Sequence, residues 1–192
     1  MKESGMALKE IRIHGRGGQG AVTSSQVLAI AAFHDGKHCQ AFPNFGVERT
    51  GAPVESYVRI DEKPINVRQQ VYQPDYVIVL DATLIESTDV AAGLKEKGLI
   101  IINTDKDEKE LRAKFKGNFS IRPVNITKIA LNVIGKPFVN IASLGAFCAM
   151  TKEVSIQALE KAIDELFAES GKQAVAELNK KAAKAVAEAC KK

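Results

Sequence analysis

Two uninterrupted runs of apolar residues limit the folds that this chain can adopt. The first run is Tyr76–Leu80 and the second is Leu99–Ile102, and each is followed by a polar residue, Asp81 and Asn103 respectively. Short runs of β-branched and aliphatic residues are typical of central parallel strands that are covered by helices on both faces. The two runs therefore predict the interior of a parallel sheet.

Strand-like and helix-like segments alternate before these runs. The expected elements are a strand over residues 8–14, a helix over 19–34 and a second strand over 38–42. Together with the two apolar runs, this alternation indicates an α/β fold with a doubly wound, mostly parallel sheet.

A β-hairpin is expected as an insertion in this pattern. Residues 54–60 alternate apolar and polar side chains, as a half-buried strand does. Residues 61–64 form a predicted turn, after which residues 65–67 are expected to return beside the strand. A helix over about 88–97 is then expected to connect the two apolar runs.

The second half of the chain is predicted to be largely helical. A polar helix over about 106–115 and a strand over 119–123 precede the helices that begin at Ile126. All residues, 1–192, are expected to form a single domain with a helical C-terminal part over about 153–192. The final helix, 172–189, is weakly apolar, and we expect it to pack on a partner rather than on this core.

Charge and hydropathy exclude two classes of partner. The net charge is only +4, and much of the excess lies in the C-terminal lysines, which indicates a solvated helix face rather than a nucleic-acid site. Residues 1–10 lack the apolar region of a secretory signal, and no stretch reaches the roughly 18 apolar residues of a membrane span. We therefore expect a cytoplasmic protein without nucleic-acid or membrane partners.

The cysteines argue against a metal centre in this chain. Cys39, Cys148 and Cys190 are far apart, and no C-x-x-C motif is present, so neither an iron–sulfur cluster nor a structural zinc is expected. An odd number of cysteines without a signal peptide indicates reduced thiols. Cys39 and Cys148 have apolar neighbours and are expected to be core residues.

A glycine-rich loop follows the first predicted strand and is the first candidate site. Closely spaced glycines before a helix allow backbone N–H groups to surround an anion at the helix N-terminus. A phosphate-bearing ligand, a partner's backbone and a tight turn without a ligand all fit this pattern. The candidate ligand- or partner-binding residues are Gly15, Arg16, Gly17, Gly18, Gln19 and Gly20.

Neither a dinucleotide fold nor a Walker-type site fits this loop well. The G-x-G-x-x-G spacing is present, but the second strand ends without the acidic residue that binds ribose, since Asp35 precedes that strand. No Lys-Ser/Thr pair follows Gly20, which disfavours ATP hydrolysis. An independent NAD-dependent dehydrogenase is therefore disfavoured.

The loop over residues 43–53 is the second candidate site. It is rich in proline, glycine and aromatic residues, and a loop of this kind is often ordered and functional. An exposed ion pair of little consequence is the alternative interpretation of its charged residues. Its candidate residues are Glu48, Arg49, Thr50 and Gly51.

Asp81 ends a central strand, and we expect it to cap the following turn.

These two loops together carry a resemblance to a known family. The stretch from His14 to Gly20, followed by Phe42-Pro43 and by Gly46 to Pro53, resembles the gamma subunit or domain of 2-oxoacid:ferredoxin oxidoreductases. The similarity extends from about Leu8 to about Glu188. The Glu-Arg-Thr-Gly-Ala-Pro stretch resembles the pyruvate- or branched-chain-type members.

The resemblance implies a reaction that this chain does not complete alone. It implies oxidative decarboxylation of pyruvate with coenzyme A to acetyl-CoA and CO2, with electrons passed to ferredoxin. It also implies alpha, beta and delta subunits that carry thiamine diphosphate, magnesium and [4Fe–4S] clusters. This chain lacks the Gly-Asp-Gly signature of thiamine binding. We therefore expect a non-redox subunit that supports assembly and contributes to the coenzyme A or active-site environment.

Two alternatives remain open at this point. The first keeps the family but replaces pyruvate by 2-ketoisovalerate or indolepyruvate. The second is a stand-alone nucleotide-binding module without an enzymatic role. Solvent exposure of Val175, Leu178 and Val186 on the last helix would indicate a partner surface.

Overall fold

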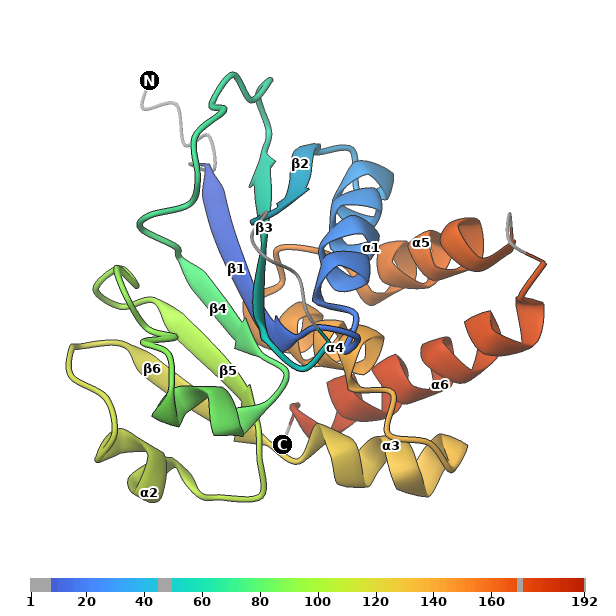
Figure 1. Ribbon diagram of the computed structural model, residues 1–192. Coiled ribbons are helices and arrows are strands. Elements are labelled where there is room, and N and C mark those ends of the chain that lie inside the picture. Colours follow the sequence, from blue (N-terminus) through green and yellow to red (C-terminus); the bar gives the residue numbers. More distant parts are fainter. Residues whose placement is uncertain (1–7, 45–49, 169–170, 192) are drawn as a thin grey trace.

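The computed structural model describes residues 8–44, 50–168 and 171–191 and contains a six-stranded sheet flanked by helices (Figure 1). The order across the sheet is β2-β3-β1-β4-β5-β6. The strands are β1 (Lys9–Arg16), β2 (His38–Pro43), β3 (Pro53–Asp61), β4 (Tyr76–Val79), β5 (Leu99–Asn103) and β6 (Ser120–Val124).

The topology confirms the predicted mixed α/β fold. Strands β1, β4, β5 and β6 are parallel to one another, whereas β3 is antiparallel to both β1 and β2. From β1 the chain first builds the β2–β3 side of the sheet and then crosses to β4 on the other side. At the carboxyl ends of β1 and β4 the chain therefore leaves in opposite directions, toward β2 after β1 and toward β5 after β4. Ligands of open α/β sheets bind at such a point.

The predicted hairpin of residues 54–60 with residues 65–67 does not form. Residues 65–67 do not form a strand; instead β3 pairs with the preceding strand, β2, from His38↔Asp61 to Pro43↔Ser56. The 65–67 segment is instead bound by side chains: Gln40 on β2 donates to the carbonyl of Ile65 at 3.0 Å, and Arg59 on β3 donates to the carbonyl of Val67 at 3.5 Å. A side-chain contact of this kind leaves no signal in the local pattern of apolar residues.

The helices cover the two faces unequally. Helices α1, α4, α5 and α6 lie on one face of the sheet (Figure 1). A smaller apolar cluster on the other face includes Val79, Ile102 and Leu84. The helices are α1 (Ala21–His34), the 3₁₀ helix η1 (Ala82–Glu86), α2 (Glu108–Arg112), α3 (Ile126–Ile134), α4 (Val139–Thr151), α5 (Ile156–Ala168) and α6 (Gln173–Ala189).

The predicted helix over 88–97 is absent, and the predicted helix over 106–115 is shortened to α2. Residues 88–97 form turns because a buried arginine donates hydrogen bonds to two of their carbonyl groups, which a helix would use internally. The guanidinium of Arg12 on β1 donates to the carbonyls of Val90, at 3.3 Å, and Ala92. Gly93 has a φ of 69°, and a Cβ there would lie 2.0 Å from the carbonyl oxygen of Tyr72. These long-range contacts override the local helical pattern.

The prediction that α6 packs on a partner instead of this core was wrong. Ala176, Ala183 and Val186 are fully buried inside the chain, and Val175 and Leu178 are half-buried. The reason is the close approach of α6 to α4, where a Cβ on Gly145 would lie 2.0 Å from the carbonyl oxygen of Ala183. Small residues allow two helix backbones to meet, so α6 is buried without needing large apolar side chains.

Candidate functional site

The glycine loop turns the chain from β1 into α1 at the carboxyl edge of the sheet. Gly18 and Gly20 have φ values of 90° and 79°, a left-handed conformation that strains other residues. A Cβ on Gly20 would also lie 2.5 Å from the side-chain nitrogen of Asn140. Gly20 occupies the N-cap of α1, no side chain caps this terminus and its first turn holds no acidic residue. The N-terminus of α1 therefore keeps its capacity to bind an anion.

A cavity of about 890 Å³ opens beside this loop, at the ends of β4 and β5. The N-termini of α1, α3 and α4 all contribute to its wall. Asn125 caps α3 by accepting from the backbone N–H of Lys128 at 2.9 Å, but no side chain caps α4, which begins after Phe138. The lining residues are Gly18, Gln19, Gly20, Leu80, Asp81, Ala82, Thr83, Asn103, Thr104, Asp105, Asn125, Thr127, Pro137, Phe138, Val139 and Asn140.

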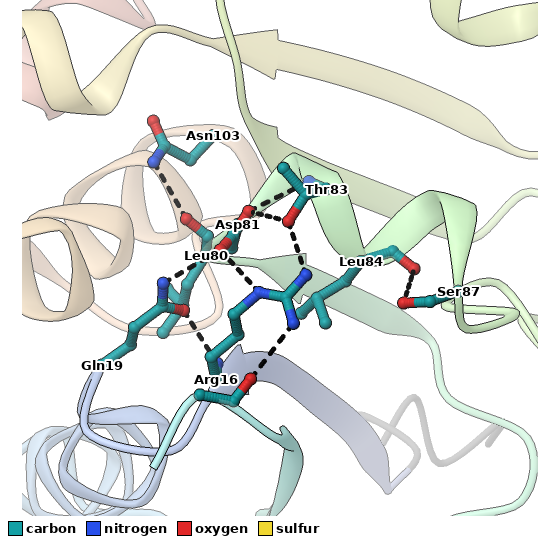
Figure 2. Close-up of polar contacts among 9 residues, drawn as sticks. Arg16, Gln19, Leu80, Asp81, Thr83, Leu84, Ser87 and Asn103 are labelled. Atoms are coloured by element: carbon teal, nitrogen blue, oxygen red, sulfur yellow. Dashed lines mark hydrogen bonds and ion pairs between the residues drawn. The ribbon is translucent and has the colours of Figure 1, made fainter.

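Asp81 lies at the centre of a hydrogen-bond network in the wall of this cavity (Figure 2). Its Oδ1 accepts from the backbone N–H of Thr83 at 3.0 Å, which confirms the predicted cap, and from the Thr83 hydroxyl at 2.7 Å. Its Oδ2 accepts from Gln19 Nε2 at 3.0 Å and from Arg16 Nε at 3.1 Å. Burial raises the pKa of Asp81, but the hydrogen bonds from Thr83, Gln19 and Arg16 outweigh burial and leave the pKa below its usual value.

Arg16 is engaged on three sides rather than directed freely toward an anion. Besides its ion pair with Asp81, it donates to the hydroxyl of Thr83 at 2.7 Å (Figure 2). It also donates to the carbonyl of Gly51 at 3.1 Å. Its side chain remains 29% exposed. Arg16 was a candidate binding residue in the sequence, and the structure shows its charge engaged in contacts between separate segments of the chain.

The two candidate loops meet in the structure. The backbone N–H of Gly17 donates to the carbonyl of Ala52 at 2.8 Å, and the N–H of Gly51 donates to the carbonyl of Gly17 at 3.1 Å. Thr50 is exposed and lines a second cavity, of about 490 Å³, together with Arg16 and residues of the first turn of α1. Glu48 and Arg49 lie outside the described residues.

Asn103 fastens the opposite wall of the large cavity. Its side-chain nitrogen donates to the carbonyl of Leu80 at 2.9 Å, and its side-chain oxygen accepts from the backbone N–H of Thr127 at 3.1 Å. Its position at the end of an apolar run drew attention to it in the sequence.

Thr127 and Asn140 also line the cavity but were not predicted as site residues, because nothing in the local sequence relates them to the glycine loop. The available signal was their position near the start of a helix, Thr127 in α3 and Asn140 in α4.

The cysteines form no reactive site in the described part of the chain. Cys148 is buried and Cys39 is half-buried against the core, as predicted. Burial raises the pKa of Cys148 to about 12, so its thiol stays protonated at neutral pH. Within residues 8–44, 50–168 and 171–191, no group of three or more His, Cys, Asp and Glu side chains could hold a metal ion.

The helices of these described residues are too short or too polar to span a membrane singly. Helices α3 and α4 meet the criteria of length and apolarity only as a pair bent by 114°.

Comparison with known proteins identifies the family. A family model described as pyruvate ferredoxin/flavodoxin oxidoreductase matches residues 10–189. The chain belongs to this family. The resemblance inferred from the two loops is thereby confirmed.

Relatives within the family match nearly the whole chain. The pyruvate synthase subunit PorC of Methanocaldococcus jannaschii is 54% identical over 174 residues, which are 91% of this chain and 92% of that protein. The common gamma subunit of the pyruvate/ketoisovalerate oxidoreductases of Pyrococcus abyssi is 52% identical over 184 residues, 95% of this chain and 96% of that protein.

A solved structure supports the same assignment. The crystal structure of the pyruvate oxidoreductase subunit PORC from Thermotoga maritima superimposes with a TM-score of 0.81 at 41% identity. The match covers 94% of this chain and 96% of that chain. The family's fold is therefore present over nearly the full length.

Proposed function

We propose that this chain is the gamma subunit of a cytoplasmic pyruvate:ferredoxin oxidoreductase, and that residues 1–192 form one domain. In this role it is a non-redox subunit that assembles with alpha, beta and delta subunits. Thiamine diphosphate, magnesium and [4Fe–4S] clusters reside on those partners, and ferredoxin accepts the electrons. This proposal is supported by the names of two relatives, each about half identical to this chain over most of its length and most of their own.

The contribution of this chain to the reaction is a wall of the coenzyme A site. The single observation that carries this proposal is the convergence of three helix N-termini, two of them without a side-chain cap, on one cavity. Backbone N–H groups at such termini suit the phosphate groups of coenzyme A. The volume of about 890 Å³ and the apolar side chains Leu80, Pro137 and Phe138 suit its uncharged parts.

Each part of the candidate site has a place in this proposal. Gly18, Gln19 and Gly20 form the anion-binding wall, with Gly15, Arg16 and Gly17 as the rest of the loop, and Thr50 and Gly51 adjoin that loop. Glu48 and Arg49, outside the described residues, stay candidates for binding substrate or a partner subunit. A polar wall of this kind also excludes water from a reactive intermediate held by a neighbouring subunit. Asp105 is exposed, and the charge of Asp81 is balanced by Arg16, so neither carboxylate abolishes the attraction for an anion.

A second candidate substrate is 2-ketoisovalerate. The Pyrococcus abyssi relative is named as a subunit common to pyruvate and ketoisovalerate oxidoreductases. A gamma subunit shared between two such enzymes would leave the choice of 2-oxoacid to its partners. The same purified complex, assayed with both 2-oxoacids, separates the two substrates.

The subunit role is tested by mild anaerobic affinity purification of this chain from its native host. We expect iron–sulfur proteins to co-elute and the eluate to reduce viologen in a reaction that requires both pyruvate and coenzyme A. A lone, colourless and inactive protein, obtained under conditions that preserve such complexes, would contradict the proposal and favour a stand-alone module.

The coenzyme A site is tested by Asn140→Asp in the purified complex. Asn140 lies in the first turn of α4 and against Gly20, so an added carboxylate is favourable for both helix termini but repels phosphate. The KM for coenzyme A should rise at least about tenfold, while the KM for pyruvate stays unchanged. Asn132→Asp, exposed on α3 and outside the cavity, is the matched control. An unchanged KM for coenzyme A in Asn140→Asp would refute this location.

A further inference from the structure

We infer that Asp81 is a positioning residue for the proposed coenzyme A site. Through Arg16 and Gln19, its carboxylate holds the glycine loop and the segment around Gly51 as one wall. This inference rests on the proposed function, because the site that Asp81 shapes is the one assigned there to coenzyme A.

The first part of the argument is a closed ring of hydrogen bonds in the glycine loop. The side chain of Gln19 accepts from the backbone N–H of Arg16 at 2.8 Å through Oε1 and donates to Asp81 Oδ2 at 3.0 Å through Nε2. Arg16 Nε donates to the same carboxylate oxygen at 3.1 Å. Two ends of the loop, Arg16 and Gln19, are thus tied to one carboxylate oxygen of Asp81, at the N-cap of η1 just beyond β4.

The second part is the reach of Arg16 beyond this ring. Its guanidinium also contacts the hydroxyl of Thr83 (Figure 2) and the carbonyl of Gly51, so one side chain joins its own loop to two other stretches of the chain. Asp81 holds both Arg16 and Thr83, and hydrogen bonds to a charged group are stronger than neutral ones. Removal of this carboxylate would release the loop on which the α1 N-terminus depends.

The third part is the sign of the electrostatic effect. A carboxylate in the wall of an anion site repels the ligand, so a purely electrostatic Asp81 would weaken binding. A positioning Asp81 strengthens binding, because the loop it holds presents the N–H groups at the α1 N-terminus. Neutralising Asp81 therefore changes the KM for coenzyme A in opposite directions under the two interpretations.

The experiment measures steady-state kinetics of the purified complex carrying Asp81→Asn, Arg16→Gln or both. We expect the KM for coenzyme A to rise about tenfold in each single variant, with kcat within about twofold and the KM for pyruvate unchanged. The KM for coenzyme A of the double variant should not exceed that of the more affected single variant, because both substitutions break the same ring of hydrogen bonds. Glu108→Gln, which removes an exposed ion pair with Arg122, is the control.

Other outcomes would overturn the inference. A KM for coenzyme A that falls or stays constant in Asp81→Asn excludes a positioning role, as do additive effects in the double variant. If Asp81→Asn does not assemble, Gln19→Ala supplies the test: it removes two hydrogen bonds of the ring without changing charge. It should raise the same KM about threefold, and an unchanged KM contradicts the inference.

The two proposals fail separately. If Asn140→Asp raises the KM for coenzyme A and Asp81→Asn does not, the coenzyme A site is supported and the positioning role of Asp81 is contradicted. If Asn140→Asp has no effect, the site itself falls.

Discussion

At the residue scale, a buried histidine lies immediately before the glycine loop. His14 on β1 is 2% exposed, and its Nδ1 lies 3.5 Å from Glu55 Oε1. Burial lowers the pKa of His14 to about 4, and the charge of Arg12 contributes in the same direction against the opposing effect of Glu55. His14 is therefore neutral in the folded protein at neutral pH.

This depressed pKa predicts a loss of stability in mild acid. The unfolded chain binds a proton at His14 near pH 6.5 and the folded chain only near pH 4, so stability is full above pH 6.5 and decreases as the pH falls toward 4. Urea denaturation across this range should show a smaller pH dependence for His14→Gln than for the original chain. His38→Gln, at an exposed position, should retain the full dependence; an identical slope in both variants would contradict the prediction.

At the element scale, the contact between α4 and α6 depends on one glycine. Gly145 is fully enclosed, and a Cβ there would lie 2.0 Å from the carbonyl oxygen and 2.8 Å from the carbonyl carbon of Ala183. Both atoms belong to the backbone, so no side chain can rotate away to make room. The two helices would have to move apart and lose their buried contacts.

Gly145→Ala should therefore destabilise the chain despite the higher helix propensity of alanine. Propensity favours alanine by about 1 kcal/mol, whereas overpacking of a close helix contact costs about 3 kcal/mol or more. The net loss of about 2 kcal/mol lowers the melting temperature by roughly 4–8 °C, which differential scanning calorimetry measures. Asn132→Ala, exposed on α3, should change it little. An unchanged or raised melting temperature for Gly145→Ala would show that the helices separate without cost.

At the scale of the whole molecule, the reversal in strand order creates the candidate site. β1 lies between an antiparallel pair on one side and three parallel strands on the other, and the connections diverge at its carboxyl end. Three helices begin around that point, although α1 is separated from α3 and α4 by about half of the chain. The cavity is thus a property of the topology, and the family relationship gives it a ligand to test.

The sequence alone determined the features that depend on neighbouring residues. The apolar runs identified β4 and β5 because strands buried on both faces need continuous apolar residues. The capping role of Asp81 was predictable because its carboxylate accepts from a backbone N–H two residues later. The two loops also carried the family resemblance, because their glycine and proline positions reflect local backbone geometry.

Only the tertiary structure decided which distant groups meet. Residues 88–97 form turns instead of the expected helix because Arg12 donates hydrogen bonds to their carbonyls. Contact with α4 buries α6, a helix whose composition had predicted packing on a partner. The partners of Arg16 likewise come from distant segments, the turn at Gly51 and the start of η1 at Asp81 and Thr83. Such contacts depend on the path of the whole chain through space, which periodicity and local composition do not encode.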